Sequence, residues 1–265
     1  MPSEPEAPFR LTELLVGRAL HLTPASEPAC FIVLEGGLLC TRQGEAAGRR
    51  YGVGEGFCAP RTGPLTLRGP ARVWQVAGRA DLVWALGRFA AQLSRKDPLT
   101  AAHSARVGRL AAAMGRFLGW ESPRLEQLAL SAYLHDLGKL GLPTALLQRP
   151  APLALPEWHR LTRHPREGRR LLEDTPLAFA AVVAEEHHER LNGSGYPAGL
   201  REGELTLEGQ LVAVADTFDA ITHGRPYREP RSPQGALSEI NRYSGVLFAR
   251  EAVSALNAVT KRTLA

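Results

Sequence analysis

Two short clusters of potential metal ligands constrain the fold of this chain more than any other feature of its sequence. His135 and Asp136 are adjacent within Leu-His-Asp-Leu-Gly-Lys, and His187 and His188 are adjacent further along the chain. Neither pair can complete a metal site alone, because a structural zinc takes about four ligands and a catalytic zinc about three. The chain must therefore fold so that both pairs, and ligands from other segments, reach one place.

The candidate ligands for that place are five of the eight histidines and two aspartates. They are His103, His135, Asp136, His164, His187, His188 and Asp216. So many nitrogen and oxygen donors without sulfur exceed the needs of a single zinc ion. Two metal ions that share a bridging carboxylate fit this set better. Imidazole and carboxylate donors together suit iron, manganese, cobalt or zinc, and the order of affinities does not choose among them.

Short apolar runs separated by glycine mark the first part of the chain, up to residue 79. The runs are 31–34, 38–40, 65–67 and 73–76. Their length and spacing predict a small all-β barrel. The segment resembles the double-stranded β-helix of cupin-like and cyclic-nucleotide-binding domains. Glu55 and Arg61 could contact a nucleotide, but the helix expected between them has no room, which favours a sensory, regulatory or dimerising barrel.

A single helix is predicted over residues 80–96, where apolar residues recur at spacings of three and four and Pro98 marks the end. With residue 97 it would form a linker helix between two domains. Its apolar stripe has two interpretations: a coiled-coil seam in a homodimer, or a face that packs on its own domain.

The chain from residue 98 to residue 265 has the periodicity of an all-α domain. One helix is expected to end at His135 and Asp136, which would turn both side chains toward a central site. Another is expected over about 207–222, with Asp216 within its apolar series. A carboxylate beside a buried face needs a partner, because an unpaired buried charge is very costly.

Composition narrows the class of protein. The net charge of +5 is spread along the chain without a basic stripe, so duplex DNA is not an expected partner. No apolar run reaches the length of a membrane span, and the N-terminus lacks a signal pattern, so we expect a cytoplasmic protein with no membrane partner. Cys30, Cys40 and Cys58 have no metal-site or disulfide spacing and are expected to be free, buried thiols.

The ordered set of motifs in the second half resembles the HD-GYP subgroup of the HD metal-dependent phosphohydrolases. The matching segments are 100–107, 134–139, 164–168, 187–197, 214–220 and 225–228. The resemblance implies an all-α HD-GYP domain over 98–265 that hydrolyses cyclic di-GMP to pGpG, or onward to GMP. The predicted fold class is thus two domains: a β-barrel over 1–79, a linker helix over 80–97 and this all-α domain.

The resemblance also implies how the ligands are shared between two divalent metals. His103, His135, Asp136 and Asp216 would hold the first, and Asp136 would bridge to the second. His164, His187 and His188 would complete the second. A hydroxide between the metals would attack phosphorus, because paired cations lower the pKa of bound water. Iron and manganese are the first candidates, with zinc, cobalt and nickel as alternatives.

Substrate contacts are implied at five positions. Lys139 is one of only three lysines among 32 basic residues. It would act as a catalytic residue with Asp136 and neutralise charge on the phosphoryl oxygens. Arg225 and Arg228 would bind substrate phosphate. In the Gly-Ser-Gly-Tyr-Pro loop, Gly195 would shape the turn and Tyr196 would stack or hydrogen-bond at the rim.

Several departures from the family pattern keep alternatives open. Leu99 stands where some members carry a glutamate that binds a third metal, so two metals are predicted. Leu191, Asn192 and Ala249 replace residues that are usual in the family. These changes leave a catalytically weak receptor, which binds cyclic di-GMP or a GGDEF-type diguanylate cyclase, as an alternative to an enzyme. An HD phosphohydrolase acting on another nucleotide is a further alternative, which the Gly-Tyr-Pro loop disfavours.

Overall fold

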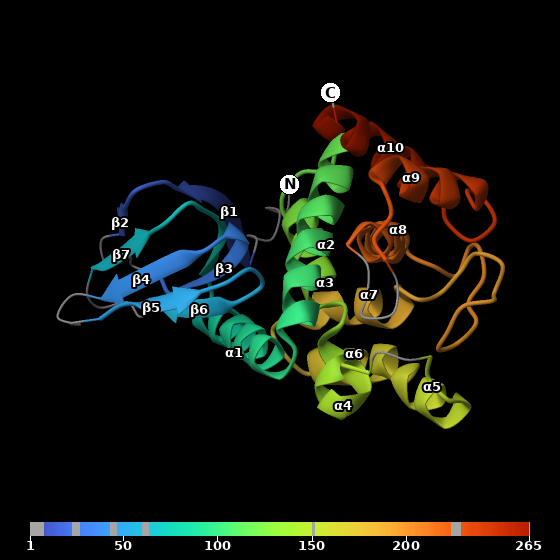
Figure 1. Cartoon of the computed structure of the whole chain (residues 1–265), viewed down its shortest axis with the longest axis horizontal. Coiled ribbons are helices and arrows are strands. Elements are labelled where there is room, and N and C mark those ends of the chain that lie inside the picture. Colours follow the sequence, from blue (N-terminus) through green and yellow to red (C-terminus); the bar gives the residue numbers. More distant parts are fainter. Residues whose placement is uncertain are drawn as a thin grey trace, which may run out of the picture. The chain divides into compact units, whose positions relative to one another are not determined.

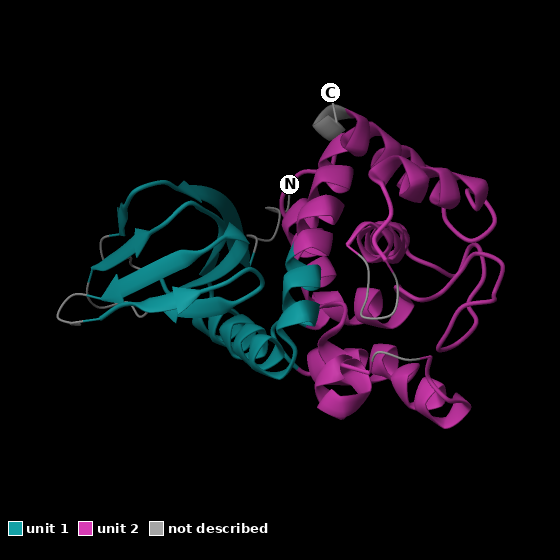
Figure 2. Ribbon diagram, viewed as in Figure 1, with its two compact units in different colours: residues 1–105, 175–177 teal, residues 106–174, 178–265 magenta. Residues whose placement is uncertain are grey.

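A computed structural model describes most of the chain, over residues 8–22, 27–42, 47–59, 64–149, 152–223 and 229–264. The chain divides into two compact units (Figure 2). Unit 1 comprises residues 1–105 and 175–177, and unit 2 comprises residues 106–174 and 178–265. Among the described helices, none combines the length and the apolar character needed to cross a membrane.

The described strands of unit 1 form two antiparallel sheets of four strands each (Figure 1). Their bounds are Phe9–Val16 (β1), Leu20–Leu22 (β2), Ala29–Gly36 (β3), Leu38–Arg42 (β4), Arg49–Tyr51 (β5), Gly56–Ala59 (β6), Leu65–Arg68 (β7) and Ala71–Gly78 (β8). The strand orders are β1-β8-β3-β6 and β2-β7-β4-β5. The predicted strand runs therefore lie in β3, β4, β7 and β8.

Strand β3 is buried on both faces, because alternate residues point to opposite sides of a sheet. Phe31 and Val33 belong to the apolar cluster of the strands. Cys30 and Ile32 point the other way, toward helix α1 (Ala80–Lys96), where a side chain added at Gly87 would lie 3.5 Å from the Cys30 sulfur. One face of the β1-β8-β3-β6 sheet is thus covered by α1.

Helix α1 has the predicted bounds, but it does not have the predicted role. Its apolar stripe is buried, with Leu82, Leu86 and Leu93 each no more than 1% exposed. It packs on β3, β6 and β8 of unit 1, which is the second interpretation of the stripe. The apolar face is consequently used within the chain and is not available as a coiled-coil seam.

The predicted fold class, an all-β domain and an all-α domain separated by a linker helix, is wrong. Helix α1 does not link two domains but is part of the body of unit 1. The division between the units falls inside the next helix, α2 (Pro98–Phe117). The chain is an α/β fold in which the strands of residues 9–78 precede the helices. The segment bounds at residues 79 and 97 remain predictions.

The described part of unit 2 is helical. Its elements after α2 are Arg124–Leu134 (α3), Leu137–Gly141 (η1), Thr144–Leu147 (α4), Leu155–Leu161 (α5), His164–Glu173 (α6), Ala178–Ala180 (η2), Ala181–Glu186 (α7), Leu207–Thr222 (α8), Pro233–Arg242 (α9) and Arg250–Leu264 (α10). The η elements are short 3₁₀ helices, and the expected helix over 207–222 is α8.

Helix α8 runs through the core of unit 2. Every residue from 209 to 216 is buried, and α8 packs on α7, α9 and α10. Its start is fixed by Thr206, whose hydroxyl accepts the backbone N–H of Gly209 at 3.0 Å. The buried Glu186, at the end of α7, accepts both the backbone N–H and the hydroxyl of Thr206. This capping ties α8 to α7 and sets where Asp216 lies.

Candidate metal centre

The first ligand pair lies where helix α3 stops. His135 is the C-cap residue of α3, and Asp136 precedes the 3₁₀ helix η1. The apolar neighbours Leu134 and Leu137 are 1% and 0% exposed, which anchors the turn in the core. His135 and Asp136 are therefore held at 0% and 2% exposure by the packing of the residues around them.

Gly138 allows η1 to approach helix α6 closely. A Cβ at this position would lie 1.9 Å from the carbonyl oxygen of His164 and 2.5 Å from the amide nitrogen of Gly168. Only glycine fits such a backbone contact. The approach brings Asp136 beside His164, the first residue of α6, with 3.2 Å between Asp136 Oδ1 and His164 Nε2.

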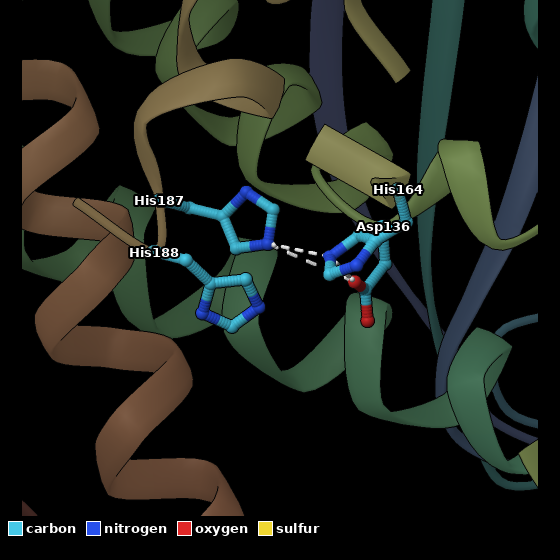
Figure 3. A group of neighbouring side chains, drawn as sticks. All are labelled: Asp136, His164, His187 and His188. Atoms are coloured by element: carbon cyan, nitrogen blue, oxygen red, sulfur yellow. Dashed lines mark hydrogen bonds and ion pairs between the residues drawn. The ribbon is translucent and has the colours of Figure 1, made fainter. Parts of the chain in front are cut away.

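The second ligand pair lies at the end of helix α7. His187 is the C-cap residue of α7 and is fully buried. Its Nε2 lies 3.2 Å from His164 Nε2 and 3.8 Å from Asp136 Oδ1. Figure 3 shows the three imidazoles of His164, His187 and His188 gathered around the Asp136 carboxylate. Each of these four residues offers a ligand atom, and these atoms all lie within 4.8 Å of one another.

Backbone carbonyls fix the orientation of three of the imidazoles. Nδ1 of His135, His164 and His187 lies 2.6, 2.8 and 2.9 Å from the carbonyl oxygen three residues earlier. A carbonyl oxygen only accepts, so each Nδ1 carries the proton and donates it. In a neutral ring, Nε2 then presents a lone pair. This arrangement is how proteins orient histidines that bind metal.

The two facing Nε2 atoms of His164 and His187 fit a shared cation. With both Nδ1 atoms protonated, neither Nε2 of the neutral rings has a hydrogen to donate to the other. Two lone pairs 3.2 Å apart repel unless a positive charge lies near both. A divalent metal that accepts both lone pairs fits this geometry and the chemistry of the donors.

The protonation states suit metal binding. Burial lowers the pKa of His164, and it lowers the pKa values of His187 and His188 well below the usual range. Burial acts in the opposite direction on Asp136, but the charge of Lys139 holds the pKa of this carboxyl well below its usual value. Near neutral pH the site offers an ionised carboxylate and neutral imidazoles at His164, His187 and His188, which are the forms that bind metals.

Of the two remaining predicted ligands, His103 belongs to a ligand group and Asp216 does not. His103, on α2, forms a second group with His135 and Asp136, in which the ligand atoms are again within 4.8 Å of one another. Asp136 is common to both groups. Asp216 is 4% exposed and belongs to neither group, although its charge opposes the lowering of the pKa values of His187 and His188.

The predicted substrate residues are placed in part. Lys139 is nearly buried, and its Nζ lies 2.5 Å from Asp136 Oδ2. The Tyr196 ring lies 4.7 Å from the His188 ring, tilted by 31°. A Cβ at Gly195 would lie 2.4 Å from the Cα of Glu189, so the loop passes directly over the backbone there. Arg225 and Arg228 lie outside the described residues.

Glu189 is a positioning residue to which the sequence interpretation gave no role. Its side chain is fully buried, and its carboxylate accepts the backbone N–H groups of Ala198, Gly199 and Leu200 at 2.6, 3.1 and 3.1 Å. These bonds tie the segment after Tyr196 to the residue that follows His188. The adjacency of Glu189 to the two histidines was the only sequence signal for this role.

Two further residues beside the site were given no role from the sequence, although Arg106 lies within the matching segment 100–107. Trp158, on α5, is 45% exposed, and its ring lies edge-on to the Tyr196 ring at 6.0 Å. Arg106, on α2, donates two hydrogen bonds to the Asp219 carboxylate, at 2.7 and 2.8 Å. Asp219 lies one helical turn after Asp216, so this bidentate pair holds α8 against α2 close to the candidate ligands.

Comparison with known proteins places the chain in a family. The model of the HD domain family matches residues 89–251, beginning within α1. A cyclic di-GMP phosphodiesterase of Thermotoga maritima is 39% identical over 163 residues, which cover 60% of this chain and 44% of that protein. A 3'3'-cGAMP-specific phosphodiesterase of Vibrio cholerae is 36% identical over 148 residues, which cover 56% of this chain and 32% of that protein.

The fold is also found in a solved structure. An HDG"Y"P protein from Bdellovibrio bacteriovorus matches with a TM-score of 0.51 and 15% identity, covering 95% of this chain and all of that one. That single chain matches the strands and the helices together, which supports the correction to the fold class. The chain spans less than half the length of the two phosphodiesterases. By the match over residues 89–251, the chain belongs to the HD domain family, and the predicted resemblance to its HD-GYP subgroup is confirmed.

Proposed function

We propose that this chain is a metal-dependent phosphodiesterase that hydrolyses cyclic di-GMP. The observation that carries the proposal is the group of buried Asp136, His164 and His187 with the partly buried His188, whose ligand atoms lie within 4.8 Å of one another in a chain of the HD family. Relatives that share the matched region are named for the hydrolysis of cyclic dinucleotides. Together these features favour an enzyme of the same class.

We assign two divalent metals to the site. One would be held by His103, His135 and Asp136, with Asp216 as the fourth ligand, and the other by Asp136, His164, His187 and His188. The presence of Asp136 in both groups supports its role as the bridging carboxylate. Iron and manganese suit this donor set first, and zinc, cobalt and nickel are the alternatives. Bound metals would supply Lewis acidity and lower the pKa of a water between them.

Lys139 is assigned to the phosphoryl group of the substrate. Its ammonium lies 2.5 Å from Asp136 Oδ2, so a cation is already held at the edge of the ligand group. A phosphodiester that reaches the site places its nonbridging oxygens beside this ammonium. Charge that develops on those oxygens in the transition state is then neutralised, with no reorganisation of the side chain.

The aromatic pair beside His188 is assigned to a base of the substrate. Tyr196 lies against His188, and Trp158 stands edge-on to Tyr196 with nearly half of its surface exposed. A purine can stack on such a surface, which is worth about 1–3 kcal/mol per base. Arg225 and Arg228, outside the described residues, are proposed to bind the second phosphate.

The substitution at Asn192 leaves the loop intact, which favours an enzyme over a weak receptor. Asn192 Oδ1 accepts the backbone N–H of Ser194 at 3.1 Å and its hydroxyl at 2.7 Å. A carboxylate oxygen would accept the same two bonds, so asparagine is equivalent to aspartate as an acceptor here and preserves the turn. Binding of a diguanylate cyclase stays a proposal for a separate interaction.

The test is product analysis with purified protein loaded with manganese or with iron. Cyclic di-GMP and 3'3'-cGAMP are incubated separately, and the products are identified by mass spectrometry. We expect pGpG or GMP from cyclic di-GMP, at a rate that chelation with EDTA abolishes. Faster turnover of 3'3'-cGAMP would reassign the substrate to that dinucleotide. Binding of cyclic di-GMP without hydrolysis under either metal would overturn the proposal in favour of a receptor.

A further inference from the structure

Unit 1 contains a hollow of about 320 Å³ that has no part in the proposed chemistry. It lies among α1, β4, β5 and β6, all within unit 1, and β6 lies against α1 (Figure 1). The residues that decide its chemistry are Arg42, Arg49, Arg88, Arg95, Tyr51 and Trp84. A hollow of this size is at the lower end of the range of ligand pockets, which is roughly 300–1,000 Å³.

Small residues make the floor of the hollow. A side chain at Gly87 would meet the Cys58 sulfur at 2.1 Å, and one at Gly56 would meet the Cβ of Ala90 at 2.8 Å. Helix α1 therefore packs directly on β6, and no bulky side chain fills the space above this contact. The longer side chains on either side then form walls around a hollow.

The walls carry a concentrated positive charge. Four arginines line the hollow, and within the described ranges no ion pair joins Arg49, Arg88 or Arg95 to a carboxylate. Glu55 is the acidic residue of the lining, and its Oε2 accepts the backbone N–H of Gly52 at 2.6 Å. Like charges around a concave surface raise the local concentration of anions, and guanidinium groups match phosphate oxygens in pairs.

One wall also offers an aromatic face. Trp84 is 50% exposed although it lies on a helix whose other large apolar residues are buried. The Tyr51 ring is already covered, by the Phe57 ring at 4.4 Å and by the Arg49 guanidinium at 5.0 Å. Trp84 is therefore the ring of the lining that remains open for stacking on a flat group of a ligand.

We propose that this hollow binds a small phosphorylated compound with a planar ring, of the size of a single nucleotide. The arginines would hold the phosphate and Trp84 would cover the ring. A cyclic dinucleotide is about twice that size, so the ligand is distinct from the proposed substrate. Helix α1 forms one wall of the hollow, and residue 97 alone separates it from α2, which carries the candidate ligand His103. A compound bound in the hollow would therefore contact the helix that directly precedes α2.

The test uses the full chain and a readout specific to the hollow. Cys58 lines it, and the cysteines of the chain all lie before residue 59, away from the HD ligands in sequence. The rate of Cys58 alkylation by iodoacetamide is measured by peptide mass spectrometry, with AMP, GMP, pyrophosphate or citrate present, and affinities are measured by calorimetry. We expect AMP or GMP to bind and slow the alkylation. The double variant Arg88→Ala, Arg95→Ala should bind about tenfold or more weakly, as loss of charged hydrogen bonds predicts.

Matched variants separate the parts of the proposal. Arg68→Ala removes an exposed arginine of β7 outside the hollow and should leave the affinity unchanged. Trp84→Ala should weaken AMP but not pyrophosphate. If the double variant does not fold, Arg49→Ala replaces it. The proposal is overturned if no nucleotide slows Cys58 alkylation, if citrate protects better than either nucleotide, or if the arginine variants are protected as well as the wild type. Failure here leaves hydrolysis at the HD site untouched, because that activity is measured separately.

Discussion

Gly138→Ala should reduce metal binding at the site although it replaces none of the candidate metal ligands. A Cβ at residue 138 would lie 1.9 Å from the His164 carbonyl oxygen, whereas ordinary contact begins at 3.4 Å. The backbone of η1 and that of α6 must therefore separate by about 1.5 Å, because neither clashing group is a flexible side chain. Asp136 lies two residues before Gly138, and His164 is itself the clashing residue.

The separation is large compared with the tolerance of a metal site. Ligand distances must be kept to about 0.2 Å, so a shift of more than an ångström between Asp136 and His164 disrupts the second ligand group. Overpacking of this kind costs about 1–3 kcal/mol. In a chain of this size that predicts a melting temperature lower by roughly 4–8 °C for a cost near 2 kcal/mol. We expect a folded protein whose metal content falls at least about tenfold.

Metal content measured by mass spectrometry after dialysis, together with thermal unfolding, checks this prediction. Gly141→Ala is the matched control, because it lies in the same 3₁₀ helix and a Cβ there meets nothing within 4 Å. Equal metal loading of Gly138→Ala and the wild type would refute the argument. Equal loss of metal in both glycine variants would also refute it, since the loss would then come from the helix and not from the close approach.

Three other predictions concern Glu189, Trp158 and Cys58. Glu189→Gln keeps one acceptor oxygen in place of two, so hydrogen exchange should accelerate at the amides of residues 198–200 while metal content stays unchanged. Unaltered exchange there would remove the positioning role. Trp158→Ala should raise KM for cyclic di-GMP about tenfold with little change in kcat, and Trp158→Phe should restore it, as expected for stacking; an effect on kcat alone would contradict this. Cys58 should react with iodoacetamide faster than the buried Cys40, because a hydrogen bond between the thiols of Cys58 and Cys30 lowers the pKa of Cys58. Preferential labelling of Cys40 in the folded protein would disprove that order.

Local structure could be predicted where the residues that determine it lie within one short segment of the chain. The bounds of α1 follow from its apolar spacing and the proline after it, and those of α8 from its apolar series. The position of His135 and Asp136 at a helix end followed from the glycine just beyond them. Each of these features depends on contacts between residues that are close in sequence.

Long-range packing was not predictable in the same way. The apolar stripe of α1 could serve a dimer or its own unit, and its packing on β3, β6 and β8, which includes the close approach of Gly87 to Cys58, decides between them. The roles of Glu189 and Trp158 depend on where a loop and a distant helix fold back. Cys58, expected to be buried, is only partly buried because it lines the hollow beside α1.

The metal content of an Asp136 variant tests the central proposal most directly. Asp136 belongs to both ligand groups, so Asp136→Asn removes a charge from each while keeping the size of the side chain. Asp174→Asn, at an exposed aspartate after α6, is the control. We expect about two metal ions per chain in the wild type and the control, and loss of both metal and cyclic di-GMP hydrolysis in Asp136→Asn. Full metal loading and full turnover in Asp136→Asn would contradict it.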